Sequence, residues 1–238
     1  VNVAMIGEMR DPETISAAFS LQARIPGVTV TMFQRLPALG SYHNETAKLQ
    51  PAEVYCAIGD DTICASPKWD AAIAEAVTAN PNGLWWWSCE GDRQAIYPIT
   101  SEAWRVANDG RIFTDLFPFW FDDVWLREVA VMVTGQDVPR IPGAKLIDCP
   151  TPTNRMRDLL FWDDFFNQTR PARLNEAQKI AANLGIEMKP GLAETLAMNW
   201  RPNEEFRAMA TGVVDLQGDK NEPTPEYLQA KTRAERIL

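Results

Sequence analysis

The chain has 238 residues, of which 46% are hydrophobic and 23% charged. This composition is typical of a globular protein with a substantial core and excludes a disordered chain. The net charge of −9 argues against a broad basic face for a nucleic-acid backbone. No apolar run reaches the roughly eighteen residues that a membrane span needs. No signal-peptide pattern opens the sequence, so we expect a cytoplasmic protein.

Strand-like and helix-like segments alternate over residues 1–90. The apolar runs that indicate strands are 1–7, 27–33, 53–59 and 83–89, and the helical patterns between them cover 11–24, 41–50 and 65–77. We expect Asp11, Ser41 and Ser66 to cap these helices, because short polar side chains favour that position. Repeated alternation of strand and helix predicts an α/β fold with a mainly parallel sheet covered by helices on both faces.

The pattern changes in the second half of the sequence. Residues 101–109 predict a capped helix ended by Gly110, and 121–135 predict one that stops at Gly135. Residues 144–150 indicate a last strand, and longer helices follow, above all over 156–185. We therefore expect a core domain over 1–150 and a helical C-terminal extension over 151–238 that packs on it.

Polar residues follow the predicted strands where each strand ends. They are Gly7, Glu8, Gln34, Arg35, Asp60, Asp61 and Glu90. In an open α/β sheet, ligands bind beyond the carboxyl ends of the strands, so these residues mark a candidate binding edge. Asp60 and Asp61 repel each other unless a cation lies beside them, which indicates a divalent metal held by oxygen ligands. The alternative is an ordinary turn or helix cap.

Four segments occur in an order that carries a family resemblance. They are "MIGEMRDPETI" near the start, "SYHNETA" at 41–47, "AIGDD" followed by "SPKWD" at 57–70, and "FWFDDVWLREVA" at 119–130. Over residues 1 to about 135 the sequence resembles the nucleotide-sugar glycosyltransferases of the GT-A fold, particularly short members of family 2. The resemblance implies a Rossmann-like sheet, with a nucleotide-binding half over 1–90 and an acceptor half over 91–150.

The resemblance also implies an activity, a cofactor and a donor site. A sugar would move from a nucleotide-sugar donor to an acceptor hydroxyl with the help of Mn²⁺ or Mg²⁺. Asp61 would bind the metal, and Asp60 would contact the ribose or a metal-bound water, or be a second ligand. The residues expected to line the donor pocket are Gly7, Glu8 and Arg10, with His43, Asn44 and Lys48 on one helix facing the donor.

The sequence departs from the family pattern at two positions. An aspartate that usually ends the second strand and holds the nucleobase is replaced by "QRLP", with Gln34 or Arg35 as the substitute. The arginine that usually precedes the asparagine of the second segment is His43. The identity of the base is therefore left open.

The resemblance assigns the general base of an inverting transfer to Asp123, with the adjacent Asp122 as its rival. Neighbouring helical residues point about 100 degrees apart, so only one of them can face the site. A different interpretation is a helix N-terminus whose acids interact favourably with the helix dipole.

The acceptor side has three candidates, Trp87, Glu90 and Asp92. Trp85 and Trp87 share one face of the predicted strand and Trp86 takes the other. Core packing is the expected role of two of these tryptophans, whereas sugars stack on indole rings and Trp87 could border the acceptor. The acceptor itself is open between a glycan, a small molecule and a modified nucleic acid.

Other functions remain possible on the same residues. One is a catalytically degenerate protein of this fold that binds a nucleotide or a partner, and another is a nucleotidyltransferase. "AIGDDTI" is also similar to the metal-binding hairpin of RNA-dependent polymerases. That hairpin needs a strand that returns after Asp61, where this sequence leads to a Ser-Pro helix start at Ser66.

Overall fold

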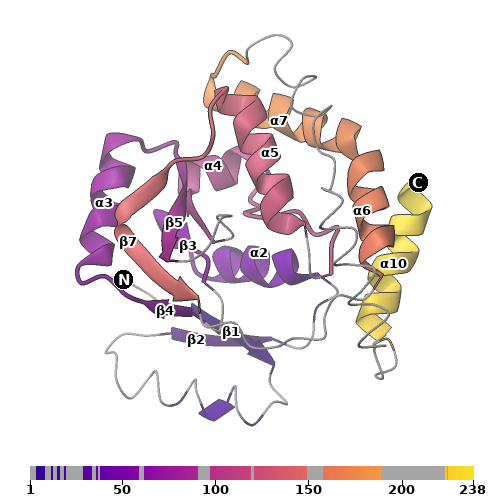
Figure 1. The fold of residues 1–238 in the computed structure, drawn as a ribbon, viewed down its shortest axis with the longest axis horizontal. Coiled ribbons are helices and arrows are strands. Elements are labelled where there is room, and N and C mark those ends of the chain that lie inside the picture. The colour runs from indigo at the N-terminus through magenta and orange to yellow at the C-terminus, as the bar shows by residue number, and fades with distance from the viewer. Residues whose placement is uncertain are drawn as a thin grey trace.

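The computed structural model describes residues 4–8, 12, 15–16, 19, 29–33, 36, 38–58, 62–90, 97–118, 121–148, 158–188, 223 and 225–238. These residues form a mixed α/β fold (Figure 1). Helix α3 lies on one side of the larger sheet, and α5, α6 and α7 lie on the other. The α/β expectation is therefore confirmed.

Two strands near the N-terminus form a small parallel sheet. They are β1 (Ala4–Glu8) and β2 (Thr29–Phe33), and Glu8 pairs with Phe33. The two expected strands are thus present, but they stand as a pair of their own.

The described residues also form a five-stranded sheet in the order β3-β6-β5-β7-β4. Its strands are β3 (Val54–Cys56), β4 (Thr62–Cys64), β5 (Leu84–Glu90), β6 (Pro98–Ser101) and β7 (Arg140–Asp148). Strands β5 and β7 are parallel, whereas β3 with β6, β5 with β6, and β4 with β7 are antiparallel. The sheet is mixed, so the expectation of a mainly parallel sheet is corrected. A short connection such as that from β5 to β6 permits an antiparallel neighbour, and only a long crossover gives a parallel one.

The helices in the described residues are α2 (Leu39–Leu49), α3 (Trp69–Ala79), α4 (Glu102–Ala107), α5 (Asp122–Thr134), α6 (Leu159–Gln168), α7 (Arg170–Leu184) and α10 (Pro225–Ile237). Within the part of the chain that the structure describes, none of them has the length and apolarity to cross a membrane.

Local signals predicted the ends of two helices correctly. Ser101 caps α4 by accepting a hydrogen bond from the Trp104 N–H at 3.2 Å. Gly135 ends α5 in the left-handed region with a φ of 72°, which glycine adopts without steric cost.

Two other expected caps are wrong. Ser41 lies inside α2, which begins after Ala38 without a side-chain cap. Ser66 lies before α3, and its hydroxyl donates to the Gly143 carbonyl and accepts from the Lys145 N–H. A tertiary contact with β7 thus replaces the local cap, because the same hydroxyl meets both groups there.

The larger hydrophobic core lies between the sheet and the helices α5, α6, α7 and α10. Phe117 is its centre, with ring centroids at 5.9 Å from Trp125, 5.9 Å from Trp162 and 5.4 Å from Phe165. Tyr227 of α10 is buried in the same cluster. The expected boundary at Pro150 stays a prediction.

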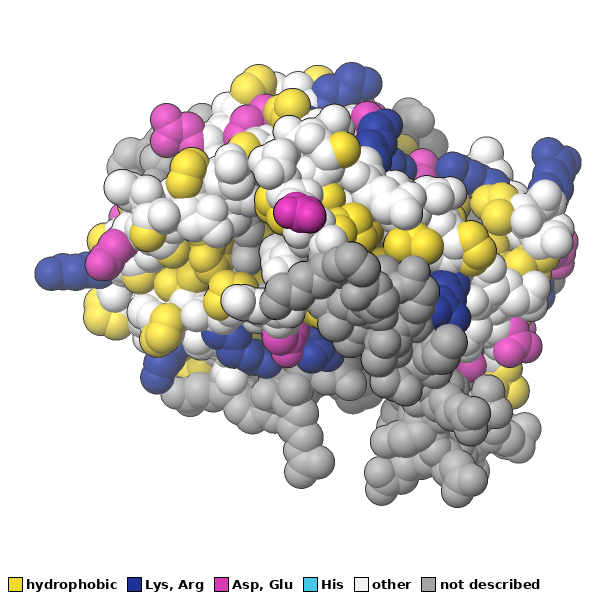
Figure 2. Space-filling model, turned by 90° about the horizontal axis from the view of Figure 1, so that it is seen from above, with side chains coloured by type: hydrophobic (Ala, Val, Ile, Leu, Met, Phe, Trp, Pro, Cys, Tyr) yellow, Lys and Arg dark blue, Asp and Glu magenta, His cyan; other side chains and the backbone are white. Residues whose placement is uncertain are grey.

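A smaller core lies on the α3 side of the sheet. It joins Ile73 of α3 to Trp85, Trp87 and Leu146. On the face shown in Figure 2, acidic and basic side chains are interspersed with apolar ones, which is the ordinary surface of a globular protein.

Candidate functional site

The acidic pair Asp60 and Asp61 lies outside the described residues, but the strands on either side of it are described. Asp61 immediately precedes β4, and Thr62 of that strand pairs with Asp148 of β7. The expectation that no strand follows the pair is therefore wrong. However, β4 and β3 lie at opposite edges of the sheet, so they do not form the hairpin of a polymerase metal site.

The first donor residues lie at the end of β1. Gly7 and Glu8 are the last residues of this strand, and Glu8 is beside Phe33, the last residue of β2. Gln34 and Arg35, like the predicted donor residue Arg10, lie outside the described residues. The structure therefore brings the ends of the first two strands together without describing their side chains.

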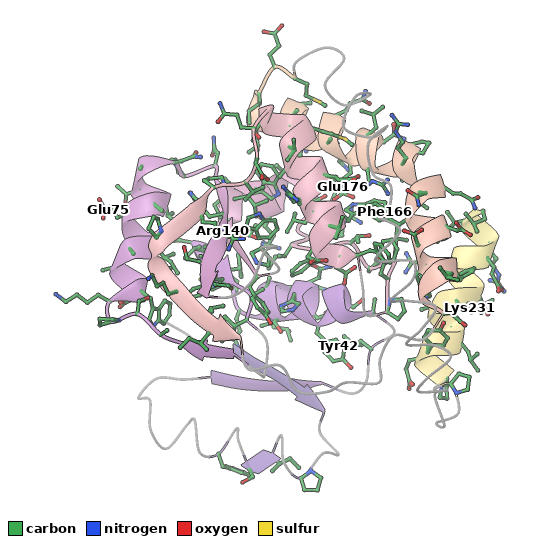
Figure 3. All side chains as sticks on the ribbon, viewed as in Figure 1. Tyr42, Glu75, Arg140, Phe166, Glu176 and Lys231 are labelled. Carbon is green, nitrogen blue, oxygen red and sulfur yellow. The ribbon has the colours of Figure 1, made fainter. Side chains whose placement is uncertain are left out.

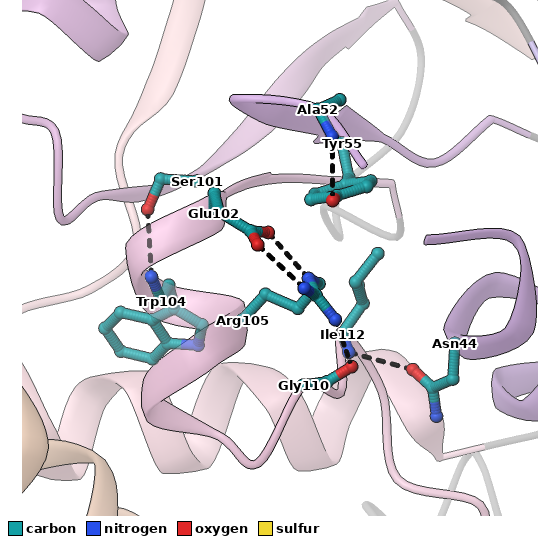
Figure 4. A network of polar contacts seen from close by, with 9 residues as sticks. All are labelled: Asn44, Ala52, Tyr55, Ser101, Glu102, Trp104, Arg105, Gly110 and Ile112. Carbon is teal, nitrogen blue, oxygen red and sulfur yellow. Dashed lines mark hydrogen bonds and ion pairs between the residues drawn. The ribbon is translucent and has the colours of Figure 1, made fainter. Parts of the chain in front are cut away.

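Asn44 of α2 holds a segment that precedes α5. Its Oδ1 accepts hydrogen bonds from the backbone N–H groups of Ile112 at 2.8 Å and Phe113 at 3.1 Å. Its Nδ2 donates to the Phe113 carbonyl at 2.9 Å. Figure 4 shows the bond to Ile112 beside the paired side chains of Glu102 and Arg105. The Asn44 amide is thus engaged with the backbone of this segment.

The other two predicted donor residues of α2 differ in exposure. His43 is half-buried, with its ring centroid 5.0 Å from that of Phe113. Burial lowers the pKa of His43 to about 4, so the ring is neutral at pH 7. Lys48 is exposed, and its ammonium lies 3.7 Å from the Glu45 carboxylate.

Asp122 and Asp123, the two candidates for the base, begin α5 in different surroundings. Asp122 is 5% exposed, and its Oδ2 accepts a hydrogen bond from the Gly40 N–H at 3.2 Å. Burial, and then the nearby charge of Asp123, raise the pKa of Asp122 well above its ordinary value. Asp123 is half-buried. The two side chains therefore have unequal access to a substrate.

Gly40 permits this close approach of α2 to the chain before α5. A Cβ at this position would lie 2.1 Å from the carbonyl oxygen of Thr114. No side chain fits there, so the backbone of α2 packs directly on residues 113–114. Sequence reasoning did not find this contact, because the expected helix began at residue 41 and the sequence does not indicate which segment packs against Gly40.

Of the acceptor candidates, only Trp87 has a described side chain. It is 1% exposed and lies 5.5 Å from the ring of Trp69, so it has no open face for a sugar in this structure. Trp85 and Trp87 belong to the smaller core and Trp86 to the larger one, which confirms their predicted alternation. Glu90 ends β5, and Asp92 lies outside the described residues.

A second group of buried charges links α5 to α7. Arg173 is 2% exposed and forms an ion pair of 2.7 Å with Glu128. Glu176 accepts a hydrogen bond from the Trp125 indole at 3.0 Å. Burial raises the pKa of both Glu128 and Glu176. Sequence reasoning did not predict this group, which joins helices that are far apart in the sequence.

No cluster of three or more histidine, cysteine or acidic residues that is able to hold a metal occurs among the described residues. The predicted ligands Asp60 and Asp61 are not among these residues, and the metal remains a proposal.

Comparisons with known proteins place the fold. No model of a known protein family matches the chain, and no curated protein matches it. Among solved structures, the chain is similar to a mannosyltransferase from Pyrobaculum calidifontis in complex with GDP-Man and Mn²⁺. The TM-score is 0.53 and the identity 13%, over 100% of this chain and 71% of that one. The chain therefore has a glycosyltransferase-like fold.

Proposed function

We propose that this protein is a metal-dependent glycosyltransferase, similar to family 2 of the GT-A fold, that moves a sugar from a nucleotide-sugar donor to an acceptor hydroxyl. The observation that carries the proposal is the glycosyltransferase-like fold over the whole chain. The motif segments support it, since they fall at the end of β1, directly before β4 and at the start of α5.

The two proposed metal ligands suit a hard cation. Asp61 and Asp60 would hold Mn²⁺ or Mg²⁺ through carboxylate oxygens, the ligands that these ions prefer. The bound cation would supply Lewis-acid stabilisation of the leaving diphosphate. Gly7, Glu8 and Arg10 line the nucleoside pocket in this proposal, and Lys48 is the exposed cation of α2 that faces the donor.

The acceptor step is assigned to α5. The acceptor oxygen attacks the anomeric carbon, its proton passes to the Asp123 carboxylate, and the bond from that carbon to the donor diphosphate breaks. Inversion of the anomeric configuration follows from this single displacement. Asp123 is favoured over Asp122 because the Asp122 carboxylate is buried against Gly40. Glu90 and Asp92 remain the proposed acceptor contacts.

The experiment measures nucleotide binding and donor turnover. Calorimetry with UDP, GDP, CMP and TDP in excess Mn²⁺ identifies the nucleobase, and hydrolysis of the matching sugar donor is followed with and without metal. We expect Asp61→Ala to abolish metal-dependent binding while the melting temperature is unchanged. The matched control is Asp70→Ala, an exposed acid in the first turn of α3, which should bind as the wild type does. If Asp61→Ala binds the nucleotide with unchanged affinity, Asp60 and Asp61 are better interpreted as part of an ordinary turn.

A second candidate is a nucleotide-binding protein without transfer. It is favoured by the end of β2 at Phe33, where Gln34 and Arg35 follow in place of the expected aspartate. Such a protein would bind a nucleotide in the same calorimetric series and leave every sugar donor intact. Release of pyrophosphate from a nucleoside triphosphate would instead indicate a nucleotidyltransferase.

A further inference from the structure

We propose that Asp122 is a positioning residue that caps helix α2 from the start of α5 and so holds the adjacent Asp123 in place for transfer. This inference rests on the proposed function for the role of Asp123. The contact itself joins residues 82 positions apart in the sequence. It ties the helix of the predicted donor residues to the helix of the predicted base.

Helix α2 begins without a cap of its own. The first N–H groups of a helix have no partner within it, and a polar side chain at the N-cap usually accepts from the second or third of them. Ala38 occupies the N-cap of α2 and makes no side-chain hydrogen bond. The Gly40 N–H, two residues on, donates instead to Asp122 Oδ2. Asp122 thus takes the place of the missing cap.

Helix α5 also begins without a local cap. Phe121 at its N-cap is in the left-handed region with a φ of 75°, which is strained for a residue with a large side chain. The Phe121 ring is 3% exposed and stacks on Phe166 at 5.1 Å. Packing on one side of this turn and the Asp122 contact on the other fix the direction in which α5 starts.

Residues 112–114, which precede α5, are held against α2 by several contacts. Asn44 binds the backbone of Ile112 and Phe113, and Gly40 leaves room only for the Thr114 carbonyl. These contacts and the Asp122 bond come from one helix. A shift of α2 at its first turn therefore moves the start of α5, and Asp123 with it.

Charge supports the same division of roles. No hydrogen-bond partner of Asp122 Oδ1 is found among the described residues. Burial and the charges of Asp123 and Asp115 raise the pKa of Asp122, so folding favours its protonated form. A protonated carboxyl still accepts from Gly40 and does not oppose an ionised Asp123. In this proposal Asp122 holds the backbone and the adjacent Asp123 acts as the base.

Two variants of Asp122 test the proposal. Asp122→Asn keeps the shape and an oxygen for Gly40, whereas Asp122→Ala removes both. With the donor that the wild type turns over, we expect kcat of the Asn variant to remain within about threefold. We expect the Ala variant to lose about 10- to 100-fold in kcat, the order that a small misplacement of a reacting group costs, with the donor KM unchanged. Asp115→Asn, which removes a nearby charge and leaves Gly40 untouched, is the control and should stay within about twofold of the wild type.

A second readout does not depend on activity. Hydrogen exchange of the Gly40 amide, followed by NMR, should be slow in the wild type and in Asp122→Asn and fast in Asp122→Ala. Equal exchange in all three proteins would overturn the cap. Fast exchange in Ala together with wild-type kcat would overturn the positioning role. If the wild type transfers no sugar, the proposed function and the role of Asp123 fail, whatever the Gly40 amide shows.

The pH dependence of the free energy of unfolding gives a third readout. A raised folded-state pKa means that the contribution of Asp122 is complete below its unfolded pKa of about 3.9 and is lost as pH rises through the folded value. Asp122→Asn carries no such titration. Its melting temperature relative to that of the wild type should therefore rise overall between about pH 4, near the unfolded pKa, and about pH 8. A constant difference over that range would contradict the burial of an ionisable Asp122.

Discussion

Helix α5 carries a buried acid, Asp122, and a half-buried acid, Glu128, and their surroundings differ. Glu128, on the side that faces α7, is paired with Arg173 at 2.7 Å. Asp122, at the start of the helix, has one hydrogen bond from a backbone N–H and an oxygen for which the described residues offer no partner. A partly buried acid with a cationic partner indicates a structural role. A buried acid that is left incompletely paired beside a second acid is a candidate for function, because an unsatisfied buried polar atom in a native structure calls for an explanation.

Between α5 and α7, the charge of Arg173 is enclosed by aromatic rings. The Arg173 guanidinium lies 3.8 Å from the centre of the Phe166 ring and 5.1 Å from that of Trp125. It also donates to the Phe166 carbonyl. In Figure 3, Phe166 and Glu176 lie beside α5 within the molecule, whereas Glu75 points outward from α3. The guanidinium therefore has two aromatic rings, a carbonyl oxygen and the Glu128 carboxylate around it.

The two regions compared are the start of α5 and its contact with α7. The largest effect on transfer should come from Asp123→Asn, at the start of α5. Transfer should fall by about 100- to 10,000-fold, the range that removal of a general base costs, with kcat lowered and donor KM little changed. Thermal unfolding should stay close to that of the wild type, because the residue is not fully buried. Asp164→Asn on the exposed face of α6 is the control. Transfer at the wild-type rate, or retention of the anomeric configuration by NMR, would remove Asp123 from the mechanism.

For Arg173 we expect a loss of stability, in contrast to the loss of activity expected for Asp123. Arg173→Met leaves Glu128 buried without its partner and should lower the free energy of unfolding by about 3 to 5 kcal/mol. The double variant Arg173→Met with Glu128→Leu should recover most of this loss, since an apolar pair replaces a buried ion pair at little cost. Urea unfolding of the three proteins measures both. A double variant as unstable as the single one would show that the guanidinium packing, and not the unpaired acid, carries the energy.

His43 tests the contact between α2 and residues 112–114 from the α2 side. Its pKa of about 4 lies below the ordinary value of about 6.5, so the neutral ring stabilises the fold above pH 6.5. This contribution, up to about 3 kcal/mol, is lost as pH falls from 6.5 to 4. His43→Gln should flatten the stability profile over this interval when unfolding is measured by urea. The same slope in both proteins would place the titration on other groups.

The smallest effect is expected on the exposed face of α5. Arg127 and Asp137 form an ion pair of 2.8 Å with side chains that are 50% and 62% exposed. Arg127→Ala should change the free energy of unfolding by less than about 1 kcal/mol, and by less still in high salt, because solvent screens such pairs. A loss equal to that of Arg173→Met would mean that burial does not distinguish these pairs.

Local sequence signals predicted α4 and α5 well because their ends depend on neighbouring residues. Ser101 bonds to a backbone N–H three residues on, and Gly135 supplies a conformation that few other residues adopt. Strand direction was predicted less well. It depends on which strands meet across the sheet, and the alternation of strand and helix does not specify that β6 lies beside β5.

The candidate site shows the same division. The sequence predicted a strand that ends near Gly7 and a helix that starts near Asp122, as β1 and α5 do. It did not show that Asp122 contacts Gly40, or that Asn44 binds the segment at 112–113, since these partners are far apart in the chain. Trp87 illustrates the difference at one residue. Its face of the strand was predictable, but its 1% exposure depends on Trp69 and the rest of the smaller core.

Helix α10 has a consequence for how the protein acquires its structure during synthesis. Its Tyr227 hydroxyl accepts a hydrogen bond from the Trp162 indole, and Lys231 lies 5.0 Å from the centre of the Phe161 ring. Among the described residues, the smaller core draws on positions 54–146, so it can form once β7 has emerged from the ribosome. The face of α6 that Tyr227 and Lys231 cover stays exposed until α10 has been made. A nascent chain therefore exposes this face for the time needed to translate more than sixty further codons, the interval in which a chaperone has most to protect.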